Sequence, residues 1–339
     1  MVCGFLGTLI GLEKAVALGK TWAYLGVAAT AAGGVGLAVA THATLPRLLL
    51  FLGSLGLVSV SATFLMRHRT DANACVLTGV LLWSVANALF LLGWPIFAVV
   101  PAWMGFLLLT VAGERLELNR LMSPSRSSRS AFFFAVASAL VAVALAGVGF
   151  ARGGSVVLTE GGARYTSSGF DHGLRLFGFS CAGIGLWLLS NDMARLAWKR
   201  PGLSRFMAVS LLAGYVWLTI SGVLSILHGA VVAGETYDAI LHSFFLGFVF
   251  SMIFAHGPLI LPAILARPLE FHPRFYVHVA LLHAGLALRL VGDLTDVVWA
   301  RSWGGLLNAI AILLFLLSTA LRMATGRRAS QQATTVAGS

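Results

Sequence analysis

Besides His278, which is ambiguous near a helix entrance, five of the nine histidines lie in or at the ends of long apolar stretches, where a titratable side chain is costly and needs a reason to be present. A neutral imidazole can ligate haem iron, copper or zinc, and the helices of a bundle can present such ligands inward. An imidazole can also serve only as a hydrogen-bonding group between helices. No HxxxH, HExxH or CxxC motif is present, so spacing does not decide between the two. The five residues are His172, His228, His242, His256 and His283.

Three of these histidines are predicted to share one depth. His228 and His242 flank a short polar turn at 235–238, and counting from that turn at about 1.5 Å per residue places both roughly 9–12 Å from it. We therefore expect the two imidazoles to face each other on antiparallel helices. The axes of two directly packed helices are about 8–10 Å apart, which suits one metal ion between the imidazoles of His228 and His242. A haem would instead take one ligand from this pair and a second from a facing helix, and His172 is the nearest candidate in depth.

His256 and His283 are predicted to form a second, deeper level. At helical rise, His256 lies about 21 Å beyond His242, so the two cannot ligate one metal ion. His283 falls close to the expected depth of His256 on the next apolar stretch. Pro258 and Pro262 are expected to open the backbone beside this pair. We therefore hypothesise that His256 and His283 form a second metal-binding site at this depth.

Two arginines within the apolar stretches have carboxylates four residues away. The spacing of Asp171 with Arg175, and of Arg289 with Asp293, predicts ion pairs on helix surfaces. Both arginines are expected near the level of the first histidine group, where a guanidinium can bind a haem propionate in bidentate fashion. The alternative is an interfacial ion pair or an arginine that extends to the membrane surface.

Composition shows what must position these residues. Hydrophobic residues make up 58% and charged residues only 10%, against about 25% charged in soluble domains. Apolar runs of roughly 20 residues recur, each long enough to cross a bilayer. The fold class predicted is all-α, a polytopic membrane helix bundle with about eleven transmembrane helices over residues 1–324, followed by a disordered polar tail at 325–339. The expected crossings are 1–18, 21–41, 44–66, 74–94, 96–114, 131–151, 170–190, 205–234, 238–262, 275–293 and 303–323.

The formal net charge of +11 also fits a membrane protein. Most Lys and Arg residues fall in alternate loops on one side of the predicted bundle, which is the cytoplasmic side by the positive-inside rule. They do not gather on one face of a soluble module, so nucleic acid is excluded as a partner and the lipid bilayer is the expected one. The carboxy terminus is predicted to be cytoplasmic.

The stretch HSFFLGFVFSMIFAHGPLILPAILARPL at 242–269 resembles the late-helix motif of NnrS, a bacterial membrane-protein family. That motif has a leading histidine, a glycine five residues later, a methionine ten residues later and a closing Arg-Pro-Leu. These correspond to His242, Gly247, Met252 and 267–269. The similarity extends over roughly 242–323.

The next apolar stretch, LLHAGLALRLVGDL, is similar to the family's following segment. The family's Leu-Arg-x-x-x-Asp-Leu matches Leu288, Arg289, Asp293 and Leu294. The histidine of the family's GHTGRP motif corresponds to Ile264, so one expected site is absent, and His256 is a departure from the pattern.

The resemblance implies a haem- and copper-containing protein of the bacterial inner membrane that helps the cell to cope with nitric oxide. Of the histidines, only His242 carries over as a motif residue. The family usually has twelve helices, so a further helix before Met1 is expected. Whether such a protein turns over a small ligand, senses it or stores a metal is not indicated, and neither is its oligomeric state.

The sequence is therefore compatible with three functions. The first is an NnrS-like haem or copper protein in which His242 is the first ligand, His228 its partner and Arg289 the anchor of an anionic haem edge. The second is a transporter or channel whose histidines line the path, for which a clear internal repeat would be expected. The third is a structural or assembly subunit.

The charge asymmetry predicts where a reporter fused after Ser339 will be active. Green fluorescent protein placed there should fluoresce, and alkaline phosphatase should be inactive, because both report a cytoplasmic location. Activity of the phosphatase fusion together with a dark fluorescent fusion would contradict the predicted topology.

Overall fold

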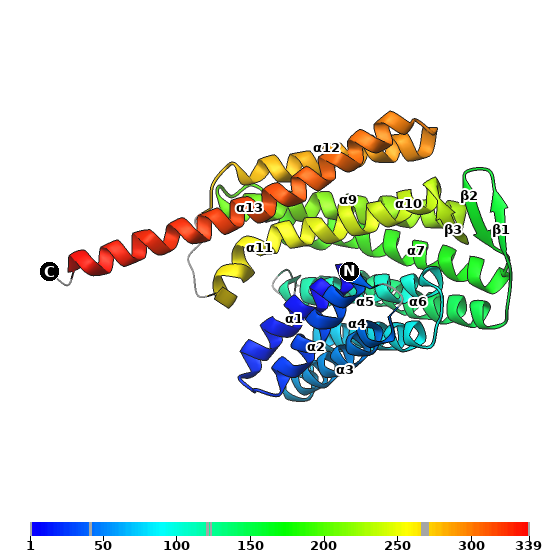
Figure 1. Cartoon of the computed structure of the whole chain (residues 1–339), viewed down its shortest axis with the longest axis horizontal. Coiled ribbons are helices and arrows are strands. Elements are labelled where there is room, and N and C mark those ends of the chain that lie inside the picture. The colour runs from blue at the N-terminus through cyan, green and yellow to red at the C-terminus, as the bar shows by residue number, and fades with distance from the viewer. Residues whose placement is uncertain (1, 41–42, 120–121, 123, 266–270, 338–339) are drawn as a thin grey trace. The chain divides into compact units, whose positions relative to one another are not determined.

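A computed structural model describes the chain except residues 1, 41–42, 120–121, 123, 266–270 and 338–339 (Figure 1). The described part is helical apart from one small sheet, and it divides into two compact units. Unit 1 comprises Met1–Asp192 with Gly222–Gly234, and unit 2 comprises Met193–Ser221 with Glu235–Ser339. The prediction of one single bundle over 1–324 stays a prediction.

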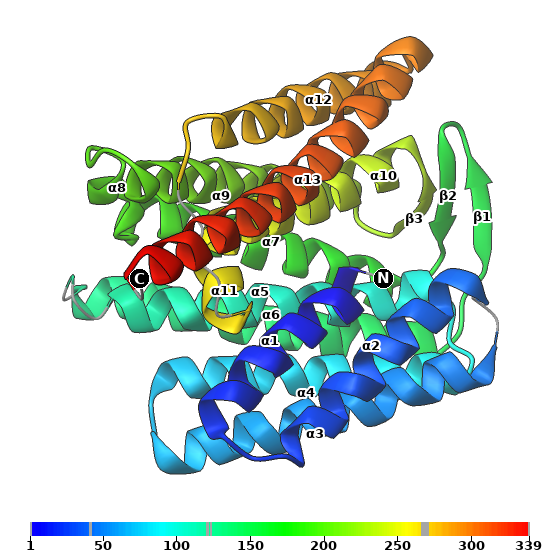
Figure 2. The ribbon, with the colours of Figure 1, turned by 60° about the vertical axis from the view of Figure 1, so that its left-hand side comes forward.

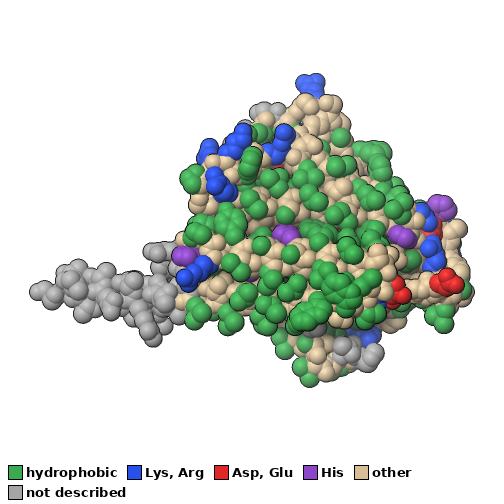
Figure 3. Space-filling view, turned by 90° about the horizontal axis from the view of Figure 1, so that it is seen from above, with side chains coloured by type: hydrophobic (Ala, Val, Ile, Leu, Met, Phe, Trp, Pro, Cys, Tyr) green, Lys and Arg blue, Asp and Glu red, His purple; other side chains and the backbone are tan. Residues whose placement is uncertain are grey.

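Among the described residues, 9 helices are long and apolar enough to cross a membrane. Two shorter apolar helices, α1 (Val2–Leu18) and α2 (Ala23–Val39), occupy the first two predicted crossings. Hydrophobic side chains also dominate the face drawn in Figure 3, whereas charged side chains gather toward its margins. The predicted all-α polytopic membrane fold is therefore confirmed, with a helix at each of the eleven expected positions. The 9 spans are Thr44–Arg67, Asp71–Leu91, Ile96–Asn119, Arg126–Ala151, Ser168–Asn191, Leu203–His228, Glu235–Pro262, Phe275–Thr295 and Val298–Leu321.

Unit 1 is built from antiparallel helix hairpins that follow one another along the chain (Figure 2). The helices α3 (Thr44–Arg67), α4 (Asp71–Leu91), α5 (Ile96–Asn119), α6 (Arg126–Ala151) and α7 (Ser168–Asn191) follow α1 and α2. Glycine lets some pairs approach closely, because a Cβ on Gly56 would lie 2.7 Å from the Cα of Gly26 across α2 and α3. Small residues at such crossings are typical of membrane bundles.

One small antiparallel sheet corrects the predicted crossing at 205–234. The helix α9 ends at His228, Gly229 has φ +60, and residues Val231–Gly234 form β3. This strand pairs with β2 (Gly162–Tyr165) of the hairpin that β2 forms with β1 (Val156–Thr159). A left-handed glycine and a β-branched Val-Val pair favour a turn and a strand over continued helix.

Unit 2 contains α8 (Ala194–Ala197), the first part of α9 (Leu203–His228) and the last helices of the chain. After α10 (Glu235–His242) the chain forms a π-helix, η2 (Ser243–Val249), and then α11 (Phe250–Leu265). Pro258 and Pro262 lie within α11, which stays helical through both. The helices α12 (Phe275–Thr295) and α13 (Val298–Ala337) run side by side in Figures 1 and 2. Their tight connection depends on Asp296, which has φ 55.

The structure continues α13 to Ala337, through residues for which the sequence predicts a disordered tail. Alanine, arginine and glutamine, which are frequent there, are good helix formers. The cytoplasmic placement of that end stays a prediction.

The close packing of α12 against α13 predicts the effect of a single methyl group. A Cβ on Gly304 would lie 2.5 Å from the backbone nitrogen of Arg289 and 2.6 Å from the carbonyl oxygen of Gly285. Gly304→Ala should therefore destabilise the protein by about 1–3 kcal/mol, the usual cost of overpacking. Thermal unfolding in detergent measures this.

Gly147→Ala is the matched control, because Gly147 is also within a helix and a Cβ there would meet nothing within 4 Å. That variant should be neutral or slightly stabilised, since alanine favours helix over glycine by up to about 1 kcal/mol. Equal unfolding temperatures for the two variants would contradict the close approach of α12 and α13.

Candidate functional site

The helix α10 carries the histidine of greatest interest for ligation. Asp238 and His242 lie one turn apart, and Nδ1 of His242 is 2.6 Å from the carbonyl oxygen of Asp238. Because a carbonyl only accepts, Nδ1 must carry the proton and donate it. The lone pair of His242 is then on Nε2, which is the atom that a metal would use. A backbone carbonyl that fixes the tautomer in this way is a common arrangement behind ligating histidines.

Five charged side chains from α10, α12 and α13 form an ion-pair network in unit 2, and Asp238, one turn before His242, belongs to it. Asp293, whose side chain is only 1% exposed, lies between Arg289 Nε at 3.7 Å and Arg301 Nε at 3.1 Å. Arg289 also approaches Asp238 at 3.6 Å, and Arg301 binds Glu235 at 3.1 Å. We call Glu235, Asp238, His242, Arg289, Asp293 and Arg301 the charge cluster. The predicted pairing of Arg289 with Asp293 is confirmed.

The sequence did not indicate that Arg301 and Glu235 belong to this cluster. Both had been placed in loops, far apart along the chain. They meet because the left-handed turn at Asp296 returns α13 along α12, and because Gly292 accommodates the backbone of Arg301. A Cβ on Gly292 would lie 2.5 Å from the nitrogen of Arg301. The sequence feature that could have indicated this close approach is Gly292, directly before the intramembrane Asp293.

The π-helix η2 begins at Ser243, directly after His242, and short π-helical segments are frequent at functional sites. Within it Gly247 packs against an aromatic ring, because a Cβ there would lie 2.4 Å from Cβ of Trp217 on α9. Trp217 in turn donates its indole N–H to Nδ1 of His283 at 3.0 Å. Trp217 therefore contacts η2 at Gly247 and His283 through its indole N–H.

The hydrogen bond from Trp217 occupies a ring nitrogen of His283 that a metal ion would otherwise use. Since Nδ1 accepts from Trp217, the proton of neutral His283 is on Nε2, and neither ring nitrogen offers a lone pair in this arrangement. A metal at His283 would require that bond to break. His256 has its Nδ1 2.8 Å from the carbonyl oxygen of Met252, and its pairing with His283 stays a prediction.

The remaining predicted residues lie in unit 1, around Asp171 at the start of α7. Asp171 accepts from Arg175 Nε at 2.7 Å, which confirms that predicted pair, and from the backbone nitrogen of Ala230 at 2.9 Å. Arg175 also donates to the carbonyls of Ile226 at 2.5 Å and Leu227 at 3.1 Å, at the carboxyl end of α9. The arginine predicted to bind a haem propionate therefore closes a helix end and anchors β3.

His172 and His228 belong to the same part of unit 1. His172 is exposed, and its Nδ1 lies 2.6 Å from the carbonyl oxygen of Ser168. It borders an open cavity of about 450 Å³ that Asp171 and Tyr165 also line. His228 is the last residue of α9. Because His228 lies in unit 1 and His242 in unit 2, their predicted face-to-face pairing stays a prediction.

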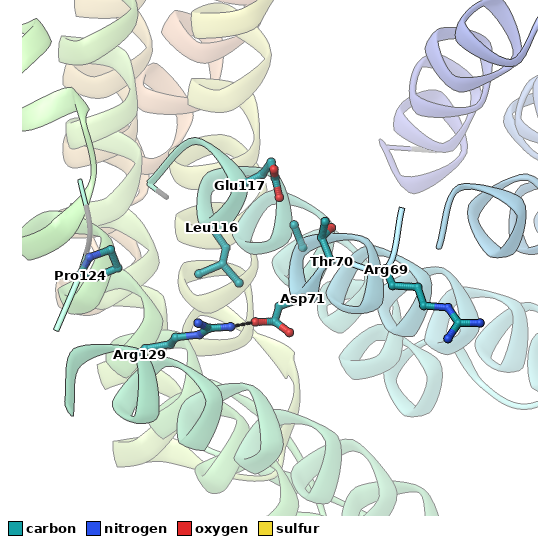
Figure 4. Close-up of a pocket in the computed structure, with 8 residues that line it drawn as sticks. Arg69, Thr70, Asp71, Leu116, Glu117, Pro124 and Arg129 are labelled. Carbon is teal, nitrogen blue, oxygen red and sulfur yellow. Dashed lines mark hydrogen bonds and ion pairs between the residues drawn. The ribbon is translucent and has the colours of Figure 1, made fainter. Parts of the chain in front are cut away.

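A second cavity, of about 430 Å³, lies at the ends of α4, α5 and α6 in unit 1 (Figure 4). Arg129 and Asp71 form an ion pair across it, and Glu117 lines its rim. Arg69 also lines it, with a side chain that points away from that pair in Figure 4. The sequence singled out none of these as a site, because isolated charges at helix ends are ordinarily solvated.

Among the residues that the structure describes, no three His, Cys, Asp or Glu side chains lie close enough together to hold one metal ion. Arg267, Pro268 and Leu269, the end of the NnrS-like motif, lie outside the described residues. The geometry thus supplies one suitably oriented histidine, His242, one turn after Asp238, which pairs with Arg289.

A family model described as a domain of unknown function, DUF8744, matches residues 1–324. The chain belongs to the DUF8744 family. No curated protein and no solved structure matches it. The DUF8744 match runs through both compact units and includes the charge cluster, but its description assigns no ligand or reaction.

The charge cluster predicts a large stability effect at Asp293. Asp293→Ala should cost about 3–5 kcal/mol, because it leaves Arg289 and Arg301 without their buried counter-charge. Asp296→Asn is the matched control, since Asp296 also pairs with Arg301, at 3.1 Å, its side chain is 86% exposed, and asparagine tolerates the left-handed backbone at this position. That exposed pair should contribute less than about 1 kcal/mol. Thermal unfolding of both variants in detergent measures the difference, and an equal loss in both would contradict the buried placement of Asp293.

Proposed function

We propose that this DUF8744 protein is a multi-pass protein of the bacterial inner membrane that binds haem or copper through His242, in an NnrS-like role in the response to nitric oxide. The observation that carries the proposal is the orientation of His242. Its Nδ1 is held by the carbonyl of Asp238 at 2.6 Å, so Nε2 is the ligating nitrogen. Bound haem or copper would supply a redox-active metal that can ligate a small molecule such as nitric oxide.

The arginines of the charge cluster fit the haem alternative. Arg289 and Arg301 have side chains that are 18% and 23% exposed, so both retain accessible surface although they pair with Asp293. Guanidinium groups bind carboxylates in bidentate fashion, and the propionates of haem are carboxylates. If haem binds, His242 would hold the iron, and Arg289, which pairs with Asp238 one turn before His242, would bind a propionate.

Copper fits the described residues less well. Copper sites ordinarily combine several His, Cys or Met ligands, whereas no group of three His, Cys, Asp or Glu side chains occurs within the part of the chain that the structure describes. A copper site at His242 would need His228, as the sequence predicts, or another ligand from outside unit 2. Haem is therefore the first cofactor to test.

Substitution of His242 tests the proposal directly. The full chain would be expressed in a bacterium supplied with haem precursor and copper and then purified in detergent. Haem would be measured as the pyridine haemochrome, and iron and copper by elemental analysis. His242→Ala should lose most of the cofactor per chain, because the ligating nitrogen is removed.

His68→Ala is the control, since His68 is exposed just beyond the end of α3. It should keep the cofactor content of the unaltered protein. Equal content in the two variants, with both monodisperse and inserted in the membrane, would overturn the assignment of His242.

A further inference from the structure

Polar side chains are buried at four successive heights along the contact between α12 and α13. We call this contact the seam and each height a level. Nearest the connecting turn are Asp293 and Arg301, and at successive levels farther along come Asn308, His278 and Thr319. Asn308 and His278 are each 2% exposed, and Thr319 is 5% exposed. The proposed cofactor site does not use the last three.

The register of the two helices is fixed by contacts between them. Gly292 lies against Arg301, Gly304 against Arg289 and Gly285 against Asn308, whose Oδ1 would be 2.7 Å from a Cβ at Gly285. Farther along, the ring of His278 lies 5.3 Å from that of Phe315. Asn308 is therefore roughly midway between Asp293 and His278, which at helical rise are about 22 Å apart.

The polar side chains lie on the facing sides of the two helices. On α13, Arg301, Asn308 and Thr319 recur at spacings of seven and eleven residues, which return to one face of an α-helix. On α12, His278 and Gly285 are seven residues apart and share a face by the same rule. The seam is thus polar at intervals along most of its length.

These groups make no hydrogen bond with the residues that the structure describes, and only Asp293 among them has ion-pair partners. Both amide atoms of Asn308, Nε2 of His278, Oγ1 of Thr319 and both carboxylate oxygens of Asp293 are buried without a hydrogen bond. A buried polar group left unsatisfied costs about 1–3 kcal/mol, and the bilayer core offers no external partner. Several such groups on one seam are unfavourable unless water hydrates them.

Among the side chains that the structure describes, the charged groups of this seam lie at the first level. Asp293 is faced by Arg289 on its own helix, by Arg301 on α13, and by Asp238 on α10. His278 is faced by the rings of Phe206, Phe254, Phe275 and Phe315, with no charged group among these neighbours. Between the levels Leu282, Leu286 and Ala311 are fully buried apolar residues.

We propose that this seam is a hydrated path by which protons cross unit 2. Protons pass between the carboxylate of Asp293 and the imidazole of His278 through water held at Asn308, and leave or enter beside Thr319. Each proton taken up at one end is released at the other, so no oxidant or reductant is consumed. The apolar residues between the levels predict slow, intermittent transfer rather than the rates of an open channel. The proposal does not depend on His242 binding a cofactor.

The test is proton flux into liposomes that contain the purified full chain. Internal pH would be followed with trapped pyranine after an external acid step, with potassium and valinomycin to compensate charge. Liposomes with the unaltered protein should acidify faster than protein-free liposomes. Asn308→Leu should reduce the protein-dependent rate at least ten-fold, because the leucine excludes water at the middle level.

Three further variants keep the test decisive. Thr319→Val keeps the side-chain shape and should also slow the flux, so it serves if Asn308→Leu does not fold. His278→Phe should do the same by removing the proton-accepting nitrogen. Ser59→Leu makes a similar polar-to-apolar change at an exposed position of α3, outside the seam, and should leave the flux unchanged.

Two results would overturn the path. One is a flux in the unaltered protein no greater than in protein-free liposomes. The other is an unchanged flux in folded Asn308→Leu, especially with a raised unfolding temperature, because a dry seam would gain stability when an unsatisfied amide is replaced by an apolar side chain.

Discussion

Asp293 lies between Arg289 and Arg301, and the packing of the last helices around it depends on this arrangement of buried charge. A carboxylate in a membrane helix is stable only when opposite charges lie close to it. The second arginine can reach it only because α13 turns back at Asp296 and passes close to Gly292 and Gly304. The same approach of backbones brings Asn308 against Gly285, so the charge cluster and the polar seam have one structural cause.

The cluster and the seam give unit 2 two kinds of chemistry. At the cluster His242 has a fixed tautomer, and Arg289 and Arg301 both pair with Asp293, a set of groups suited to an anionic ligand with a metal centre. Along the seam neutral polar groups lie unsatisfied among apolar side chains, which is suited to water and protons. The proposed cofactor at the cluster and the proposed proton path along the seam are compatible functions, since electron transfer to a buried metal is commonly balanced by proton movement.

Hydrophobic length alone predicted a helix at each of the eleven expected positions, because a bilayer-spanning run leaves little choice of secondary structure. Hydrophobic length did not predict where α9 ends. Gly229 ends this helix and Val231–Val232 start a strand inside the predicted crossing at 205–234, because local backbone preferences decide there. At the site, four-residue spacing predicted the Asp171–Arg175 and Arg289–Asp293 pairs. Arg301, Glu235 and the Trp217–His283 bond were not predicted, since each depends on helix packing between residues distant in sequence.

The absorption spectrum of the purified full chain in detergent, recorded oxidised and then reduced with dithionite, tests the proposed cofactor most directly. The arrangement of His242 with Arg289 and Arg301 predicts a Soret band that shifts on reduction, with iron present in a fixed ratio to the chain. A spectrum without a band above the protein absorbance in either state, together with no iron or copper by elemental analysis, would contradict it.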